Sequence, residues 1–329
     1  MMTETSGERE AAEMRPQETY AAVRGFNFQP PWGSNGRDVW RYFDPAEYRR
    51  ILQMAKAAFP GMNTVRVWLS FDAWYDLREK AVENMRTAGE ILASEGLKMI
   101  PMYFNGWHSV PDFGGISEEM LRLEESVGWQ PFLRYLRETA SALEDTGAVL
   151  LSDLCNEPFN NTRENHTDLL RNRRFLNAMA AGLREVSRTP VTVGSQGYYA
   201  PFPGAASDME FLKDTVDVFT LHPYIVAMTP TEQHLEWCRK LLATAEELGK
   251  PVIITECCWG ADTDEERGKI VDLELGHYAD LGIGFLVHAL YPSPVADLHP
   301  LDGVNPSMYM PFLLEDGSIR PYHEVFNRY

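Results

Sequence analysis

Eight short apolar segments alternate with longer amphipathic segments along most of the 329 residues, and this pattern predicts a single-domain α/β protein, a closed (β/α)8 or TIM barrel. The apolar segments have the length and composition of buried parallel strands, and the segments between them have helical spacing. The chain length suits one such barrel. An open doubly wound sheet is the alternative, but neither its G-x-G-x-x-G turn nor a P-loop pattern occurs.

The expected strands and helices follow one another in order along the chain. Local signals mark the helix ends: Asp44 and Pro45 form an N-cap with a first-turn proline, and Gly96 and Gly249 each follow a helical segment. The expected strands are 23–28, 63–71, 98–104, 148–158, 190–195, 216–221, 251–259 and 283–290. The expected helices are 44–59, 79–95, 129–144, 168–187, 231–248, 264–281 and 322–329, the last one after a hairpin-like turn at 315–318.

The start of the chain is polar and charged, so we expect a flexible acidic tail at residues 1–20 and the barrel at 21–329. No window approaches the apolar length of a membrane helix, and the tail lacks the apolar centre of a signal peptide. We therefore expect a cytoplasmic protein without a membrane partner. A secreted form stays open if a leader precedes this sequence.

The charge balance restricts the class of partner. The chain carries 30 Lys and Arg against 48 Asp and Glu, a formal net charge of −18. Such a surface repels phosphate backbones, so we expect no nucleic-acid partner. Acidic polysaccharides are disfavoured for the same reason, and neutral substrates fit better. The sequence does not determine the oligomeric state.

The four cysteines are Cys155, Cys238, Cys257 and Cys258, and three of them lie in or beside expected strand ends. Cys257 and Cys258 are neighbours on an expected strand, so their side chains should point to opposite faces and pair poorly. The spacing of the four does not match a metal site. We interpret them as reduced, structural residues, and we expect neither a metal nor another cofactor.

Two expected strands end in a glutamate. Pro158 stops the fourth strand directly after Glu157, because proline cannot donate to the ladder, and Glu256 follows Thr255 at the end of the seventh strand. In a parallel barrel both ends face the same rim, where active sites lie. Strands four and seven lie nearly opposite each other, so the two carboxylates can face one another. Cleavage of a glycosidic bond needs such a pair, about 5–5.5 Å apart for retention of configuration and about 6.5–9.5 Å apart for inversion.

Other polar and aromatic residues are expected on the same rim. Arg66 lies between Val65 and Val67 on a buried strand, where an unpaired arginine would be costly, so we expect it to have a carboxylate partner. Indole faces can pack on sugar rings, while amides and imidazoles can bind hydroxyl groups. The expected rim residues are Trp32, Arg66, Asn105, Trp107, His108, Asn156, Glu157, Gln196, His222, Tyr224, Glu256, Trp259, His288 and Tyr291.

Asn156-Glu157-Pro158 after the fourth strand and Thr255-Glu256 after the seventh resemble the retaining glycoside hydrolases of clan A, and most closely the cellulase-like family 5. The resemblance covers most of residues 21–329. Its other parts are Arg66, Trp107-His108, His222-Pro223-Tyr224 and the C-terminal stretch from Leu314 to Phe326.

The resemblance implies a hydrolase that acts by double displacement on a neutral β-linked oligosaccharide or glycoside, with Glu157 as acid/base and Glu256 as nucleophile. It also implies that Asn156 binds the sugar 2-hydroxyl and that His222 lines the subsite of cleavage. Arg66 and Tyr224 would hold and orient Glu256. The remaining substrate-binding candidates on the rim are Trp32, Trp107, His108, Trp259 and His288.

One position departs from the group, which often has a tryptophan at the end of strand eight. This chain has His288 there and Tyr291 nearby, so the sugar preference stays open. The loops 106–115 and 291–310 could wall off one end of a groove and favour exo action or short oligosaccharides. Two other functions also stay open: a carbohydrate-binding barrel without catalysis, and a metal-dependent barrel hydrolase, although the His-x-His that the latter usually has near strand one does not occur here.

Overall fold

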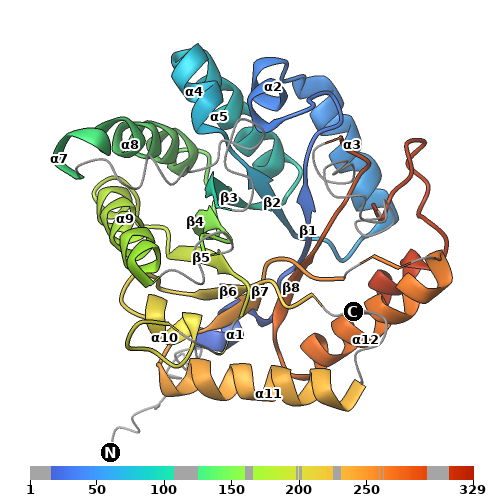
Figure 1. Ribbon diagram of the computed structural model, residues 1–329. Coiled ribbons are helices and arrows are strands. Elements are labelled where there is room, and N and C mark those ends of the chain that lie inside the picture. Colours follow the sequence, from blue (N-terminus) through green and yellow to red (C-terminus); the bar gives the residue numbers. More distant parts are fainter. Residues whose placement is uncertain are drawn as a thin grey trace, which may run out of the picture.

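The computed structural model describes residues 16–106, 125–159, 166–197, 199, 202–224, 231–258, 260–261, 263–294 and 311–329. Within them, eight parallel strands close into a barrel in the order β1-β2-β3-β4-β5-β6-β7-β8. Figure 1 shows these strands at the centre of the molecule, with helices arranged around them. The predicted single-domain (β/α)8 barrel is therefore confirmed.

Most of the strands are shorter than the apolar segments that contain them. They are β1 (Arg24–Phe28), β2 (Thr64–Trp68), β3 (Lys98–Asn105), β4 (Ser152–Asn156), β5 (Val191–Ser195), β6 (Phe219–Leu221), β7 (Val252–Ile254) and β8 (Gly284–Val287). The helices are α1 (Pro16–Ala21), α2 (Gly36–Arg41), α3 (Pro45–Ala58), α4 (Phe71–Leu77), α5 (Glu79–Ser94), α7 (Glu125–Gly128), α8 (Gln130–Glu144), α9 (His166–Arg184), α10 (Asp208–Leu212), α11 (Thr231–Glu247), α12 (Asp264–Asp280) and the 3-10 helix η2 (His323–Arg328).

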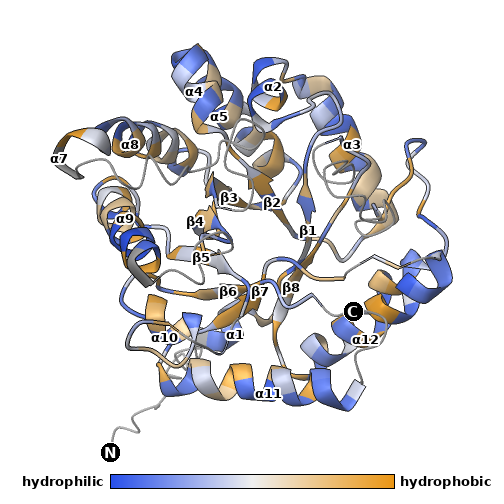
Figure 2. Cartoon of the chain, in the orientation of Figure 1, coloured by the Kyte–Doolittle hydropathy of each residue, from blue (hydrophilic) through white to orange (hydrophobic). Residues whose placement is uncertain are grey.

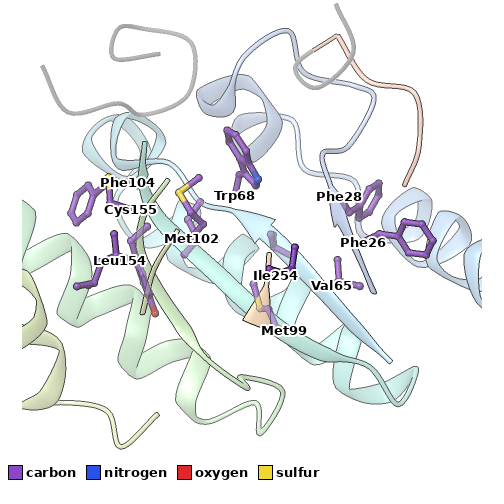
Figure 3. Packing of buried hydrophobic residues seen from close by; sticks show 14 of the residues in the cluster. Phe26, Phe28, Val65, Trp68, Met99, Met102, Phe104, Leu154, Cys155 and Ile254 are labelled. Carbon is purple, nitrogen blue, oxygen red and sulfur yellow. The ribbon is translucent and has the colours of Figure 1, made fainter. Parts of the chain in front are cut away.

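Strand side chains alternate between two apolar regions, as their period of two requires. Outward side chains such as Phe26 and Val65 join the helices in the main core, part of which Figure 3 shows. A smaller cluster fills the interior of the barrel and includes Ile100, Ile253 and Leu286. Figure 2 shows the same division, with apolar strands inside and helices whose colouring alternates between hydrophilic and hydrophobic.

The barrel interior becomes polar toward the carboxyl ends of the strands. Asn27 on β1 lies beside Arg66 on β2, and Arg66 lies beside Ile100 on β3. Directly paired residues of neighbouring strands point to the same face, so Asn27 and Arg66 share the inward face with Ile100. All three are fully buried. The strands therefore place a layer of polar groups directly on an apolar base.

Several element boundaries differ from the expected ones. The second strand ends at Trp68 rather than at 71, because the Ser70 hydroxyl caps α4 by accepting a hydrogen bond from the Ala73 amide at 3.1 Å. The seventh strand has three residues instead of the nine expected. The C-terminal turn is present, with an antiparallel bridge between Leu313 and Ile319, but the helix after it is of the 3-10 type. The short helices α1, α2, α4, α7 and α10 are not among the expected ones.

The last residues of the expected tail belong to α1. Gln17 Nε2 donates hydrogen bonds to the carbonyls of Val252 at 3.0 Å and Gly282 at 3.1 Å, and Tyr20 packs against the cluster inside the barrel. The rest of the expected tail, residues 1–15, lies outside the described residues. In the described part of the chain, no helix is long and apolar enough to cross a membrane.

The four cysteines are buried and not in disulfides. The expectation that Cys257 and Cys258 point to opposite faces is wrong, because their sulfur atoms lie 3.8 Å apart. The physical reason is that β7 ends at Ile254, so both residues lie beyond the strand, and Cys258 has a φ of 68°. Burial raises the pKa of both thiols, which keeps them protonated.

Candidate active site

Glu157 leaves β4 in a left-handed backbone conformation. Its φ is 44°, a region that favours glycine, and such strain costs about 1–3 kcal/mol. Two backbone hydrogen bonds hold the turn: Glu157 N donates to Gly194 O at 2.8 Å, and Gly106 N donates to Asn156 O at 2.7 Å. A Cβ at Gly106 would lie 2.5 Å from the Cα of Pro158, so this close approach requires glycine. Strain that the surroundings maintain at one carboxylate is typical of functional sites.

Arg66 joins the carboxylates of two different strand ends. Its guanidinium contacts Asp153 Oδ2 at 2.8–2.9 Å and pairs with Glu256 Oε1, and all three side chains are almost completely buried. Nη1 also donates to Asn27 Oδ1 at 2.9 Å, and Nη2 donates to Asn156 Oδ1 at 3.0 Å. The arginine thus has two carboxylate partners, where the sequence led us to expect one.

The surroundings of Glu256 favour its ionised form. Tyr224 donates a hydrogen bond from its hydroxyl to Glu256 Oε2 at 2.6 Å. Burial raises the pKa of Glu256, but the charges of His222, Arg66 and His288 and the Tyr224 hydrogen bond together lower it to about 2. Glu256 is therefore a carboxylate at neutral pH, buried and fixed on both oxygens.

His222 lies between the two glutamates. Its Nδ1 is 2.9 Å from Glu157 Oε1 and 3.6 Å from Glu256 Oε2, and its Nε2 is 3.0 Å from Thr255 Oγ1. The imidazole fits against β5 because residue 194 is a glycine, where a Cβ would lie 2.9 Å from His222 Nε2 and 3.0 Å from Arg66 Nη2. The three groups are close: oxygen atoms of both glutamates and a nitrogen of His222 lie within 4.8 Å of one another.

Asn156 and His288 are two further members of the expected set that lie in the site. Asn156 is buried between Arg66 and Asn105, and its Nδ2 donates to Asn105 Oδ1 at 3.1 Å. His288 is buried after β8, close enough for its charge to lower the pKa of Glu256. The peptide bond between His288 and Ala289 is cis.

Trp32 has two described contacts, and neither of them tests its predicted role in substrate binding. Its indole N–H donates to Val39 O at 2.9 Å and its ring meets the edge of Phe43, so its described contacts are with the segment after β1. Three other expected residues, Trp107, His108 and Trp259, lie outside the described residues, as do most of the loops 106–115 and 291–310. Their roles stay predictions.

Four residues with contacts in the site are absent from the sequence-based set: Asp153, Asn27, Trp68 and Thr255. Asp153 could have been found, because it is a lone charge inside the apolar run of the fourth strand. Trp68 follows Arg66 by two positions, which puts both on the same face of β2, and its ring lies 5.6 Å from the guanidinium carbon. Asn27 donates to Thr255 O at 2.7 Å, a contact between residues 228 apart that no local pattern signals.

Two groups of side chains in the described residues are close enough to hold a metal ion: Glu157, His222 and Glu256, and Cys257, Cys258 and Glu274. In the first group, Arg66 already neutralises Glu256 and both His222 nitrogens have partners. In the second, burial raises the pKa of both thiols, whereas metal ligation requires thiolates. The donor chemistry therefore suits protein hydrogen bonds better than a cation in both places.

No protein-family model matches the chain, and no curated protein sequence matches it. Solved structures do match. A GH5_18 protein from Streptomyces cattleya in complex with GlcNAc has a TM-score of 0.73 at 18% identity, over 93% of this chain and 79% of that chain. An endo-1,4-β-D-mannanase from Thermotoga petrophila RKU-1 has a TM-score of 0.68 at 16% identity, over 93% of this chain and 98% of that chain.

An exo-β-1,4-mannosidase from Opitutaceae bacterium strain TAV5 also matches, with a TM-score of 0.69 at 17% identity over 93% of this chain. This chain spans 58% of that protein's length. At these identities the likeness establishes a shared fold. The chain thus has the closed (β/α)8 barrel of these carbohydrate-active proteins, with two glutamates, a histidine and an arginine converging at the carboxyl ends of its strands.

Proposed function

We propose that the protein is a retaining β-glycoside hydrolase that acts on a neutral β-linked oligosaccharide or glycoside. The observation that carries the proposal is the pair formed by Glu157 and Glu256, whose oxygens come within 4.8 Å of each other. Retaining enzymes place their two carboxyl groups about 5–5.5 Å apart, whereas inverting enzymes leave room for a water molecule. The structural neighbours support the same class, since they include a mannosidase and a mannanase.

In the first step, Glu256 Oε attacks the anomeric carbon while Glu157 gives its proton to the departing oxygen. The carbon–oxygen bond breaks, the alcohol or shortened sugar leaves, and a glycosyl ester forms on Glu256. The structure suits Glu256 to this role, because its lowered pKa keeps it an anion and Arg66 and Tyr224 fix its oxygens. A fixed anion can attack without first losing a proton.

In the second step, water attacks the anomeric carbon of the ester while Glu157 takes one proton from that water. The ester bond breaks, Glu256 becomes a carboxylate again, and Glu157 is left protonated for the next cycle. Two inversions at the same carbon give net retention. His222 contacts both carboxylates and Asn156 contacts Arg66, which supports these two residues as candidates for binding hydroxyl groups of the sugar.

A hydrolysis screen tests the proposal. We expect turnover of at least one aryl β-glycoside or of β-mannan, β-glucan or xylan oligosaccharides, and proton NMR should show the β-anomer first. The names of the neighbours put β-mannosides at the head of the panel. Binding without cleavage would instead support a carbohydrate-binding barrel, and loss of turnover with a chelator would support a metal-dependent hydrolase. An α-anomer as the first product would contradict the retaining mechanism.

A further inference from the structure

Gln196 follows directly after β5, and its backbone is held on both sides. The Ser195 hydroxyl donates to Asp208 Oδ2, and the Gly197 amide donates to the same oxygen at 2.8 Å. Asp208 is buried at the start of α10. Ser195 also belongs to the β5–β6 ladder, since its carbonyl accepts from His222 N at 2.7 Å. The position of Gln196 is therefore set by the barrel and not by its own side chain.

The amide of Gln196 makes one polar contact in the described part of the chain. Nε2 donates to Glu157 Oε2 at 3.0 Å, whereas Oε1 is buried and has no donor within hydrogen-bonding distance there. The reverse orientation would place a carbonyl against a carboxylate. A buried carbonyl without a donor costs free energy, which a methionine of similar shape would avoid. Packing alone therefore gives no reason for an amide at this position, and the contact with Glu157 does.

Gln196 and His222 together hold the carboxyl group of Glu157. Gln196 contacts Oε2 and His222 Nδ1 contacts Oε1, so each oxygen of the group has a described partner that helps to fix its plane. The two neighbours come from different places, the end of β5 and the residue after β6. A carboxyl group held in this way presents its proton in one direction, which is what proton transfer to a bound substrate requires.

We propose that Gln196 is a positioning residue for proton donation by Glu157. The inference rests on the proposed function. Its physical basis is that a hydrogen bond to a carboxylate is stronger than one to a neutral carboxylic acid. As the Glu157 proton moves to the departing oxygen, negative charge develops on Glu157 and the Gln196 hydrogen bond strengthens. The contact therefore lowers the activation barrier for leaving groups that need a proton. It changes the barrier little for leaving groups that do not need one.

The test compares two aryl glycosides of the same sugar. The sugar is mannose if the enzyme hydrolyses mannosides, and otherwise the sugar that gives the highest activity in the screen. 4-Methylphenyl β-glycosides need a proton on the departing oxygen, whereas 2,4-dinitrophenyl β-glycosides do not. For Gln196→Met we expect kcat/KM to fall about 10- to 100-fold on the methylphenyl substrate, the size of one hydrogen bond to a charged group, and less than about 3-fold on the dinitrophenyl substrate. Gln196→His offers an N–H donor without a permanent positive charge, so at a pH above the ordinary pKa of histidine it should recover part of the loss on the methylphenyl substrate.

The control is Gln53→Met, because Gln53 is exposed and also donates to a glutamate, Glu95, at 3.1 Å. It should behave as wild type on both substrates, and thermal melts should show that each variant is folded. Equal losses on the two substrates for Gln196→Met would indicate a general disturbance and overturn the inference. No loss in Gln196→Met, or no recovery in Gln196→His, would overturn it as well. If wild type and Gln53→Met hydrolyse neither substrate, the proposed function itself fails.

Discussion

The ends of β4 and β7 present the same side chain in two different surroundings. Glu256 after β7 contacts a guanidinium and a phenol, and its pKa is lowered to about 2. Glu157 after β4 contacts the neutral amide of Gln196 and the imidazole of His222, and its backbone is strained. The difference shows that the fold gives one residue type two surroundings: a guanidinium and a phenol hold Glu256 as an anion, whereas an amide and an imidazole hold Glu157, the carboxyl group that we propose as the proton donor.

The largest test of this comparison removes the side chain that we propose as nucleophile. Glu256→Ala should lower kcat on every substrate by several orders of magnitude, because no ester can form. Added azide should restore turnover of an activated aryl β-glycoside and give the α-glycosyl azide, since azide attacks in place of Glu256. Product NMR checks the outcome. A β-glycosyl azide would mean that the two roles are exchanged.

Removal of the other carboxylate should give a smaller and more selective loss. Glu157→Ala should lower kcat/KM by about 10²–10⁴-fold on substrates with poor leaving groups, the usual size of general acid catalysis, and much less on dinitrophenyl glycosides. Azide should here give the β-glycosyl azide, because Glu256 still forms the ester. Steady-state kinetics with the two leaving groups checks it, and equal losses on both would argue against an acid role.

A third variant removes the guanidinium of Arg66, the cation that pairs with Glu256. Arg66→Met should lower the free energy of unfolding by about 3–5 kcal/mol, because it leaves Asp153 and Glu256 as buried, uncompensated carboxylates. Arg328→Met is the control, since Arg328 pairs with Asp272 on the surface and should contribute no more than about 1 kcal/mol. Urea unfolding measures both, and similar values for the two variants would refute the structural role of the buried pairs.

The smallest effect concerns pH. The lowered pKa of Glu256 contributes stability that is complete above the ordinary glutamate range and is lost as pH falls toward about 2. Glu256→Gln should therefore show a shallower fall of unfolding free energy between about pH 5 and pH 2 than wild type does. Glu265→Gln is the control, because Lys269 also lowers the pKa of Glu265 but on an exposed part of α12. A wild-type slope in Glu256→Gln would contradict the lowered pKa.

Local features of the chain were enough to predict the barrel and several of the polar residues that meet at the carboxyl ends of its strands. Apolar runs of strand length, helix caps such as Asp44, and glycines after helices recur in order, and each depends on residues close in sequence. Glu157 and Glu256 were found because each ends an apolar run, and Arg66 because a charge between two valines needs a partner. The strand boundaries were less accurate, as at Ser70, because a helix cap there ends the extended segment early.

Contacts between distant residues required the closed barrel. Arg66 and Glu256 are 190 residues apart, and Gln196 and Glu157 are 39 apart, so no periodicity links either pair. Closure of β8 on β1 brings Arg66 and Glu256 together, and the pairing of β4 with β5 brings Glu157 and Gln196 together. The glycines at 106 and 194 leave the space that these strand ends need. The chain therefore encodes which residue types lie at the strand ends, because strand and helix preferences are local. The fold sets which carboxylate meets a cation and which meets an amide, because that depends on the order, register and curvature of all eight strands.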